Sequence, residues 1–403
     1  MQTIGRRGAT ALVVGSLWAV ACGGGSDAKP DAKAKADRGA AKADPKSAAK
    51  DAPIADRKDA KRDADAKEDG DAADDAGAIA AAPAWAWTLP RGINVPPRVP
   101  EDNPMSADKV ELGHRLFMDK RLSVDGTRSC YSCHQNELGS ADGRAKALGP
   151  GNKDLPRNTP TIWNVGLSAT LYWDGRSDSL EAQALAALKG GNMALGDAVE
   201  AKAAEIGALP EYAASFAKIF GLAKDAKVTG MHVVQALSAY ERTLLCGDTA
   251  HDNDTADEAA KRGWALFAGP AGCITCHAGD NFSDGLYHRT GIGAGDPAAS
   301  GIDLGRGKPT GKPEDDFLFR TPTLRNVART APYFHDGSVA TLEEAVRIMA
   351  SGGITTAGPV DANLLDRKLT PEQQADLVAF LKSLDCPGKL EVIGDQKVDG
   401  IGG

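Results

Sequence analysis

The pattern Cys-x-x-Cys-His occurs twice in the chain, at residues 130–134 and 273–277. In this pattern the two thiols add to the vinyl groups of a haem, and the histidine supplies the proximal ligand of the iron. Two residues between the cysteines match the reach to both vinyl groups, and the adjacent histidine then lies under the ring. The sequence therefore predicts two covalently bound haems c. Their attachment and ligand residues are Cys130, Cys133, His134, Cys273, Cys276 and His277.

Two other kinds of site also use a Cys-x-x-Cys pair. A structural zinc site needs four ligands from matched knuckles, and a thioredoxin-like redox pair usually lies in a βαβ unit. The sequence around the two motifs shows neither arrangement. We therefore favour haem over both alternatives.

The first 22 residues have the features of an export signal. Arg6 and Arg7 precede an apolar run over 11–21, which is too short to span a bilayer and fits the core of a signal peptide. The sequence Ala19-Val20-Ala21-Cys22 resembles a bacterial lipobox, which predicts cleavage before Cys22 and a lipid anchor on that residue. An ordinary secretory cleavage site nearby is the alternative. Both interpretations place the protein in the periplasm, where haem c is attached.

Residues 23–84 are dominated by Ala, Asp, Lys, Gly and Pro. Because so few large apolar residues are available for burial, this segment is predicted to be a disordered linker. The formal net charge of the whole chain is −8, which argues against binding to nucleic acid.

The composition becomes that of a globular protein from Trp85 onward, and enough chain follows for two cores. We predict a mainly α fold of two tandem cytochrome c-like domains, rich in loops and poor in β-structure. The domains are expected at 85–245 and 246–390, with a tail at 391–403. Apolar residues at helical spacing predict helices over 106–117, 180–189, 197–206, 210–220, 230–245, 257–268, 341–350 and 371–384.

The two halves share a coarse repeat. Leu112-Gly-His-Arg-Leu-Phe117 precedes the first haem motif, and Arg262-Gly-Trp-Ala-Leu-Phe267 precedes the second. Each is expected to form a helix that leads into a haem-binding loop. The repeat therefore supports two domains of the same kind.

Several further motifs accompany the haem motifs. They are Leu112-Gly-His-Arg-Leu-Phe117 with Arg121-Leu-Ser123, Arg157-Asn-Thr-Pro-Thr161, Trp173-Asp-Gly-Arg176, Glu241-Arg-Thr-Leu244, Arg320-Thr-Pro-Thr-Leu-Arg-Asn326 and Ala331-Pro-Tyr-Phe-His-Asp-Gly-Ser338. With them the chain resembles the bacterial di-haem cytochrome c peroxidase and MauG family over roughly residues 100–386. The resemblance implies that the C-terminal haem is a high-potential site that receives electrons. It also implies that peroxide reacts at the low-potential N-terminal haem.

The resemblance suggests roles for three further residues. Met349 has about the spacing of the family's second iron ligand at the C-terminal haem, where a thioether raises the reduction potential. MauG itself has a tyrosine at its six-coordinate haem, so a methionine favours an electron relay. Trp173 has the spacing of the tryptophan between the two haems, and Gln183 matches a glutamine of the peroxide pocket. From the sequence alone, Met349 and Trp173 would be ordinary core residues.

The N-terminal haem differs from that of the best-known relatives, many of which ligate its iron with a distal histidine in the oxidised state. No histidine occurs between His134 and His232, and the corresponding loop, 147–152, reads Ala-Leu-Gly-Pro-Gly-Asn. We therefore expect an open iron that needs no reductive activation. His232 is more simply explained as a core or surface residue than as a replacement ligand.

The acid of the family's peroxide pocket is also missing. Cleavage of peroxide uses an acid–base group above the iron, and the expected glutamate position falls near Met193 or Ala194. Asp197 or Glu200 could replace it through a shifted loop. The simpler interpretation places both in the first turn of a solvated helix.

The resemblance also implies a calcium ion at the junction of the domains. The matching positions are Asn158, Thr330 and Pro332, which would provide one side-chain oxygen and two backbone carbonyls. Separately, Cys246 and Cys386 remain after haem attachment and the lipobox. Each follows a predicted helix, and exported chains seldom keep two free thiols, so we expect a disulfide between them.

Together these features predict a periplasmic di-haem peroxidase that reduces hydrogen peroxide with electrons from a small c-type cytochrome or a cupredoxin. A MauG-like oxidase that modifies a partner protein is one alternative. A di-haem electron carrier without enzymatic activity is another, and the missing acid would permit it. Family members are often homodimers, so a homodimer is possible.

Overall fold

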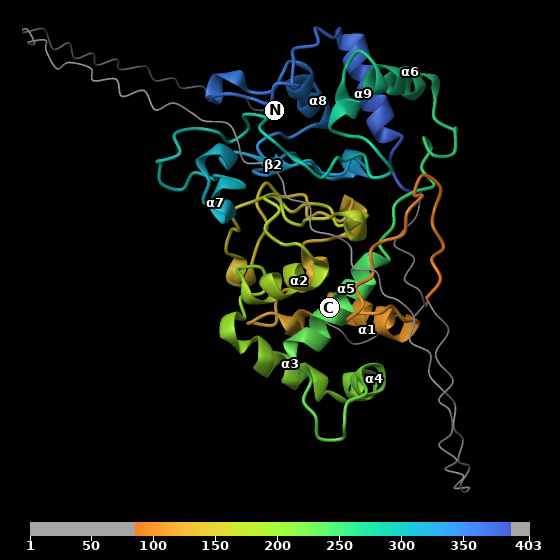
Figure 1. Ribbon diagram of the computed structural model, residues 1–403, viewed down its shortest axis with the longest axis vertical. Coiled ribbons are helices and arrows are strands. Elements are labelled where there is room, and N and C mark those ends of the chain that lie inside the picture. Colours follow the sequence, from red (N-terminus) through yellow and green to blue (C-terminus); the bar gives the residue numbers. More distant parts are fainter. Residues whose placement is uncertain (1–84, 388–403) are drawn as a thin grey trace, which may run out of the picture. The chain divides into compact units, whose positions relative to one another are not determined.

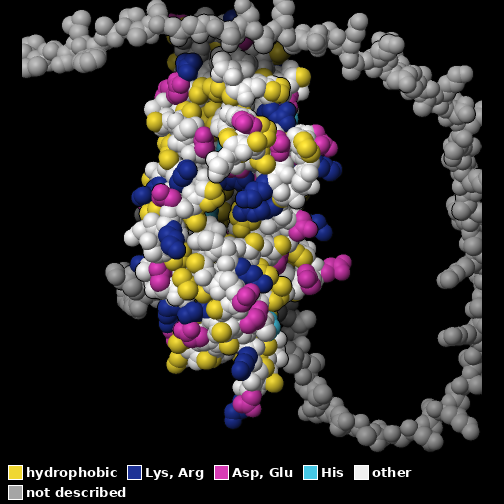
Figure 2. Space-filling model, turned by 90° about the vertical axis from the view of Figure 1, so that its left-hand side faces the viewer, with side chains coloured by type: hydrophobic (Ala, Val, Ile, Leu, Met, Phe, Trp, Pro, Cys, Tyr) yellow, Lys and Arg dark blue, Asp and Glu magenta, His cyan; other side chains and the backbone are white. Residues whose placement is uncertain are grey.

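The computed structural model describes residues 85–387 (Figure 1). The signal peptide with Cys22, the linker at 23–84 and the tail at 391–403 lie outside the described residues. Among the helices at 85–387, none is long and apolar enough to cross a membrane. Basic and acidic side chains are interspersed with hydrophobic ones over the face shown in Figure 2.

The described chain consists of helices, one two-stranded sheet and many loops. The helices are α1 (Ala107–Met118), α2 (Leu180–Lys189), α3 (Val199–Gly207), α4 (Pro210–Phe220), α5 (Gly230–Arg242), α6 (Glu258–Ala268), α7 (Gly307–Thr310), α8 (Leu342–Ala350) and α9 (Pro371–Lys382). The strands β1 (Tyr287–His288) and β2 (Phe319–Arg320) are antiparallel. Six helices begin at a residue whose side chain accepts a bond from the first turn, as caps do. These residues are Ser106, Ser179, Thr229, Asp257, Thr341 and Thr370.

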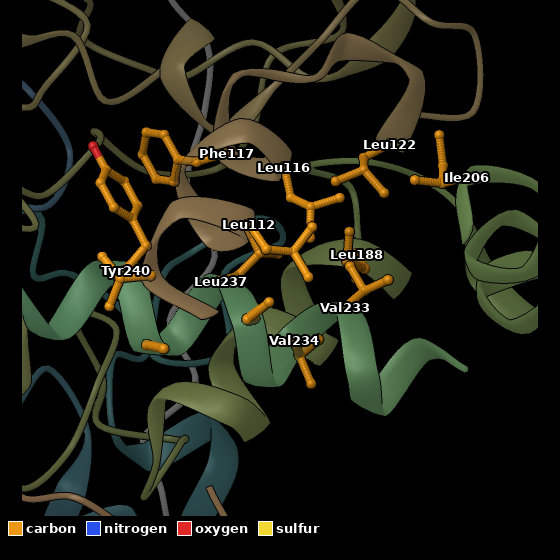
Figure 3. Packing of buried hydrophobic residues seen from close by; sticks show 14 of the residues in the cluster. Leu112, Leu116, Phe117, Leu122, Leu188, Ile206, Val233, Val234, Leu237 and Tyr240 are labelled. Atoms are coloured by element: carbon orange, nitrogen blue, oxygen red, sulfur yellow. The ribbon is translucent and has the colours of Figure 1, made fainter. Parts of the chain in front are cut away.

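The core of the N-terminal half forms where α1 crosses α5 (Figure 3). Leu112 and Leu116 of α1 pack with Leu237 of α5, and Leu188 of α2 extends the cluster. Gly113 allows the close approach, because a Cβ atom there would lie 1.9 Å from the carbonyl oxygen of Ala236. The glycine of the sequence motif therefore sets the contact of two helices.

The C-terminal half repeats this arrangement with α6 and α9. A Cβ atom on Gly263 of α6 would lie 1.9 Å from the carbonyl oxygen of Asp376 on α9. Phe267 and Phe380 form the centre of the second core, with ring centroids 4.9 Å apart. Gly113 and Gly263 occupy the same place in the repeat, so the two halves use the same helix crossing.

A second repeat, which the sequence analysis missed, lies in the loops between the halves. Residues 159–165 read Thr-Pro-Thr-Ile-Trp-Asn-Val, and residues 321–327 read Thr-Pro-Thr-Leu-Arg-Asn-Val. At the same offset of 162 positions, the loops at 171–177 and 333–339 are each closed by an isolated antiparallel bridge, Leu171 to Ser177 and Tyr333 to Val339.

These repeated loops bind each other reciprocally across the halves. The amide of Asn158 donates to the carbonyl of His335, and the amide of Arg320 donates to the carbonyl of Trp173, both at 2.8 Å. Asn158 is equivalent to Arg320, and Trp173 to His335, in the 162-residue repeat. Contacts in which each partner plays both roles are the signature of a twofold relation. The repeated loops are therefore related by an approximate twofold symmetry.

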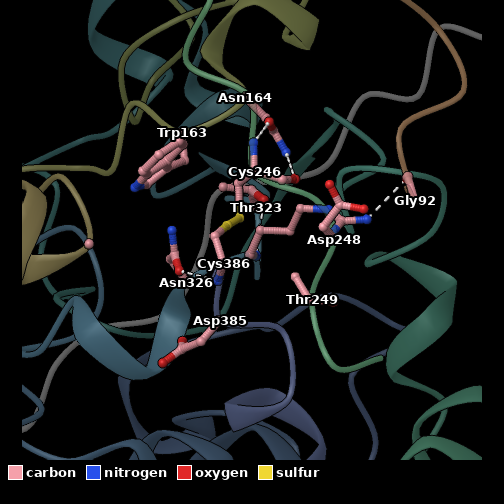
Figure 4. Close-up of a disulfide and its surroundings, with 12 residues drawn as sticks. Gly92, Trp163, Asn164, Cys246, Asp248, Thr249, Thr323, Asn326, Asp385 and Cys386 are labelled. Atoms are coloured by element: carbon pink, nitrogen blue, oxygen red, sulfur yellow. Dashed lines mark hydrogen bonds between the residues drawn. A yellow bond between two sulfur atoms is a disulfide. The ribbon is translucent and has the colours of Figure 1, made fainter. Parts of the chain in front are cut away.

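The disulfide predicted between Cys246 and Cys386 is confirmed (Figure 4). Both cysteines are buried. The side-chain oxygen of Asn164 accepts from the Cys246 amide at 2.7 Å, and that of Asn326 accepts from the Cys386 amide at 2.8 Å. Asn164 and Asn326 are equivalent in the repeat, so the disulfide joins equivalent points of the two halves.

The structure confirms the predicted fold class of two helix-rich cytochrome c-type domains with little β-structure. Each of the eight expected helices is present, with ends within three residues of those predicted. The short helix α7 was missed, because its sequence Gly-Lys-Pro-Thr carries no apolar periodicity. The domain boundaries at 245 and 390 stay a prediction.

Removing the disulfide should destabilise the haem-loaded protein. Cys246→Ala/Cys386→Ala is expected to lower the free energy of unfolding by about 2–5 kcal/mol, because the bond constrains a long loop in the unfolded chain. Urea titration followed by tryptophan fluorescence measures the change. Cys246→Ala alone should cost nearly as much as the double variant, since either change breaks the link. Separate losses that add up would contradict a disulfide.

Candidate haem sites and the cavity between the halves

The first haem motif forms a tight turn that brings its cysteines and histidine together. Cys130–Ser132 is a 3-10 helix, and the carbonyl of Cys130 accepts from the amides of Cys133 at 3.2 Å and His134 at 3.0 Å. Ser132 stabilises the start of the turn, since its hydroxyl accepts from the Ser129 amide at 3.0 Å. The turn therefore forms through the chain's own hydrogen bonds.

The second motif has the same backbone geometry. Cys273–Thr275 is a 3-10 helix, and the His277 amide donates to the Cys273 carbonyl at 3.0 Å. Gly272 precedes the turn with φ of 69°, a left-handed conformation that suits glycine. The two motifs thus present their cysteines and histidines in the same way.

Both histidines have the state that an iron ligand requires. Burial lowers the pKa of His134 and of His277, which keeps the imidazoles neutral. Nδ1 of His134 donates to the Ser140 carbonyl at 3.0 Å, and Nδ1 of His277 donates to the Phe282 carbonyl at 2.9 Å. Because a carbonyl only accepts, Nδ1 carries the proton and Nε2 keeps its lone pair. Metal-binding histidines are commonly oriented in this way.

A cavity of about 290 Å³ lies at the second motif and reaches between the halves. Cys273, Cys276 and His277 line it, and so does Met349 of α8. The structure therefore brings the suggested second iron ligand to the same cavity as the proximal histidine. Most of the remaining wall is hydrophobic, with Phe267, Leu342, Val346, Leu377 and Leu381 among its residues.

Three arginines also line this cavity without a carboxylate partner. Arg289, Arg320 and Arg367 form no ion pair within residues 85–387. The exposed arginines Arg262 and Arg347 of the same half are each paired with an acid. A cavity with two thiols, a neutral histidine, apolar walls and uncompensated guanidinium groups fits a haem, which carries two carboxylates. The residues of the second site thus suit the cofactor predicted from the sequence.

Trp173 lies at the contact between the halves and lines the same cavity. Its indole Nε1 donates to the Asn158 carbonyl at 2.9 Å, and its own carbonyl accepts from the Arg320 amide. The neighbouring carboxylate of Asp174 pairs with Arg157 at 2.7 Å, and Arg157 also pairs with Asp303 of the other half at 2.6 Å. Contacts from both halves therefore fix the position of Trp173.

The three residues suggested for calcium, Asn158, Thr330 and Pro332, line one cavity. Nδ2 of Asn158 donates to the Arg144 carbonyl at 2.7 Å, which orients the amide and leaves Oδ1 for a cation. An amide oxygen and backbone carbonyls are hard donors of the kind that calcium prefers. The residues present are therefore compatible with the ion.

The residues suggested for the distal side of the first haem lie on α2 and near the start of α3. Gln183 lies on α2, where its backbone carbonyl accepts from the Tyr172 hydroxyl at 3.2 Å. Asp197 and Glu200 are exposed, and the Glu200 carboxylate accepts from the Gly230 amide at 3.0 Å at the start of α5. Their arrangement matches the simpler interpretation, a solvated helix start.

His232 has a structural role. Its Nδ1 accepts from the Thr229 amide at 3.1 Å and completes the capping box at the start of α5. Its ring packs on Phe220 with centroids 4.7 Å apart. These contacts hold the imidazole in its own helix, as the sequence analysis favoured.

A buried acid near the first site was used in the sequence analysis only as part of a motif. Glu241 lies in α5 with 7% of its surface exposed, and burial raises its pKa to about 8. Burial also raises the pKa of the Cys130 thiol, and the nearby Glu241 carboxylate adds to that increase. The available signal was an acid that directly follows the largely apolar helix stretch 233–240. Glu241 is therefore a largely protonated carboxylic acid at neutral pH beside a haem attachment residue.

Comparison with known proteins agrees with this geometry. Residues 107–260 match the family described as di-haem cytochrome c peroxidase, and residues 260–385 match the family described as cytochrome c. The methylamine utilization protein MauG of Methylorubrum extorquens is 38% identical, over 71% of this chain and 80% of its own length. The cytochrome c551 peroxidase of Pseudomonas aeruginosa is 35% identical, over 72% of this chain and 83% of its own length.

A solved structure gives the same result. A MauG-like protein associated with microbial copper homeostasis is 37% identical and superposes with a TM-score of 0.69, covering 75% of this chain and 96% of its own. Sequence similarity and fold therefore agree. The chain is an oxidoreductase that belongs to the di-haem cytochrome c peroxidase and MauG family.

Proposed function

We propose that this protein reduces hydrogen peroxide to two waters, with two protons and two electrons from a small c-type cytochrome or a cupredoxin. The observation that carries the proposal is the position of Trp173, which contacts both halves and lines the cavity at the second haem motif. Haem iron supplies the redox chemistry when bound. The chain's own residues hold the two cofactors, connect them and control access to them.

The second site receives the electrons. His277 and Met349 line one cavity, so they would hold the haem iron with an imidazole and a thioether. A thioether stabilises ferrous iron and raises the potential, which suits a site that accepts electrons one at a time. Trp173 then offers an aromatic ring between the halves for transfer to the site of His134.

The first site is where peroxide reacts. It has no distal histidine, because no histidine lies between His134 and His232, and His232 is bound within α5. Peroxide therefore has access to the iron in the oxidised protein. Gln183 orients the peroxide through its side-chain amide. The missing carboxylate leaves proton transfer to water or to another acid.

Three further assignments complete the proposal. Calcium binds to Oδ1 of Asn158 and to the carbonyls of Thr330 and Pro332, which fixes the contact between the halves. Export by the N-terminal signal places the enzyme in the periplasm, and acylation of Cys22 anchors it to a membrane. The anchor then holds the second haem site near its soluble redox partner. A homodimer is compatible with this arrangement.

A MauG-like oxidation of a partner protein is the second candidate function. Two relatives favour it by name, the protein MauG of Methylorubrum extorquens and the MauG-like protein of known structure. Met349 argues against it, since MauG has a tyrosine at that haem. A simple electron carrier is the third candidate, and it would not need an accessible first site.

Peroxide turnover tests the proposed function. The haem-loaded protein without its tail should oxidise two equivalents of a reduced small cytochrome for each hydrogen peroxide consumed. Slow turnover with small donors, together with oxidation of a cognate protein, would favour the MauG-like function. No reaction with peroxide in a protein that carries both haems would exclude the enzymatic functions.

Replacing Met349 should change the second haem alone. Met349→Ala removes the thioether, so the potential of that haem should fall and electron uptake from the donor should slow. Redox titration followed by absorption measures both haems in one sample. Met231→Ala is the matched control, because Met231 is 47% exposed and lies on α5. A potential at the second haem that is unchanged by Met349→Ala would disprove the ligation.

Replacing Trp173 should slow transfer between the haems. Trp173→Phe keeps an aromatic ring but loses the indole and its hydrogen bond to Asn158. Turnover with the cytochrome donor is expected to fall about tenfold or more, equivalent to about 1.4 kcal/mol in the barrier. Cyanide binding at the first haem should stay the same. Trp264→Phe, in the core of the second half, is the control for the loss of an indole. Unchanged turnover in Trp173→Phe would contradict the relay.

The first haem should bind cyanide in the fully oxidised protein without prior reduction. This follows from the open distal side, which offers an exchangeable position to a small ligand. Absorption spectroscopy of the ferric protein measures the binding. Binding that appears only after the second haem has been reduced would show that another residue closes the site.

A further inference from the structure

Arg320 lines the cavity at the second haem motif, and its positive charge is not balanced by a nearby acid. It lies in β2 opposite Tyr287, and its guanidinium reaches two carbonyls, those of Tyr172 and Thr321, both at 3.3 Å. Within residues 85–387 no carboxylate pairs with it. Burial lowers the pKa of Arg320 for the same reason, since little nearby negative charge balances the loss of water. An anion beside Arg320 would therefore balance a charge that residues 85–387 leave unpaired.

The other two cavity arginines make shorter hydrogen bonds. Arg289 donates to the carbonyl of Asp316 at 2.7 and 2.9 Å and to that of Glu314 at 3.1 Å. Arg367 donates to the carbonyl of Asn363 at 3.1 Å. The two contacts of Arg320 are longer than these. Arg320 is therefore the guanidinium that an incoming anion would satisfy most.

The approximate twofold relation makes this position special. Arg320 is the equivalent of Asn158, the residue proposed to bind calcium in the other half. Their amides make the reciprocal bonds to His335 and Trp173 that join the halves. In the first copy of the repeated loop, the Asn158 side chain can bind a cation. In the second copy, the Arg320 side chain at the same position is itself a cation.

We propose that Arg320 binds a carboxylate of the haem held by His277 and that its charge raises the reduction potential of that haem. The inference rests on the proposed function, because it assigns a role to Arg320 at the electron-accepting site. It concerns a contact with the cofactor that the haem motifs do not provide.

Electrostatics gives the direction of the effect. Oxidation adds one positive charge to the haem iron, and a fixed guanidinium nearby makes that charge less favourable. Without Arg320, the haem carboxylate is uncompensated and stabilises the ferric state instead. Because the cavity walls are largely apolar, these interactions are weakly screened. Arg320 therefore acts in the same direction as the thioether of Met349.

Arg320→Gln tests the inference, since glutamine keeps hydrogen-bond donors but removes the charge. The reduction potential of the second haem should fall by about 59 mV in this variant. At the potential where the wild-type haem is half reduced, this equals an about tenfold lower ratio of ferrous to ferric haem. The first haem should change less. Arg347→Gln is the matched control, because Arg347 lies on the helix of Met349 but is exposed and paired with Glu344. It should leave both potentials unchanged.

Arg320→Lys keeps the positive charge but removes the guanidinium, so it separates the effect of charge from the effects of hydrogen bonding and folding. It should keep the potential close to that of the wild type. If Arg320→Gln fails to load the second haem, Arg320→Lys should restore loading, measured as haem per chain. An unchanged potential of the second haem in Arg320→Gln would overturn the proposal. The same would follow if both variants showed an equal fall in that potential or an equal loss of haem loading. Peroxide turnover of the wild type is measured separately, so failure of the proposed function would be distinguishable.

Discussion

The reciprocal hydrogen bonds between the two repeated loops are the interaction on which the rest of the structure depends. Asn158 binds His335, Arg320 binds Trp173, and both bonds measure 2.8 Å. Around this contact lie the cavity of the second haem motif, the indole of Trp173 and the suggested calcium ligands. The disulfide between Cys246 and Cys386 joins the halves at another pair of equivalent asparagines. Because the same loops hold the halves together and line the cavity, the geometry between the haem sites is built into the fold.

Charge is distributed unequally across this approximate symmetry. On one side Asn158 provides a neutral amide oxygen, and on the other Arg320 provides a guanidinium. Arg157 and Arg176 pair with Asp174 and Asp303, so two cations balance two anions and the group contributes position more than net charge. Arg320 has no ion pair within residues 85–387, and we propose that its charge acts on the haem. In the proposed account, the duplicated haem domains acquire two sites of different potential in this way, with Met349 and Arg320 acting together at one of them.

Much of the fold could be predicted from the sequence because the signals were local. The haem motifs identify the attachment and ligand residues directly. The helices from α1 to α9, apart from α7, follow from apolar periodicity and from capping residues such as Ser106 and Thr370. The reciprocal loops could not be predicted in this way. Their contacts join residues far apart in the chain, and the repeat that marks them, 159–165 with 321–327, has no helical or strand period. Glu241 was difficult for another reason, since its burial follows from tertiary packing and its helix would equally accept an exposed acid.

The most direct test of the account is rapid mixing of peroxide with protein in which only the second haem has been reduced. We predict that the spectrum of the first haem changes first and that the second haem is then oxidised, more slowly in Trp173→Phe. Such an order would show that peroxide reacts at the site of His134 and that the electron crosses from the site of His277. Direct oxidation of the second haem, with no change at the first and the same rate in Trp173→Phe, would contradict the account.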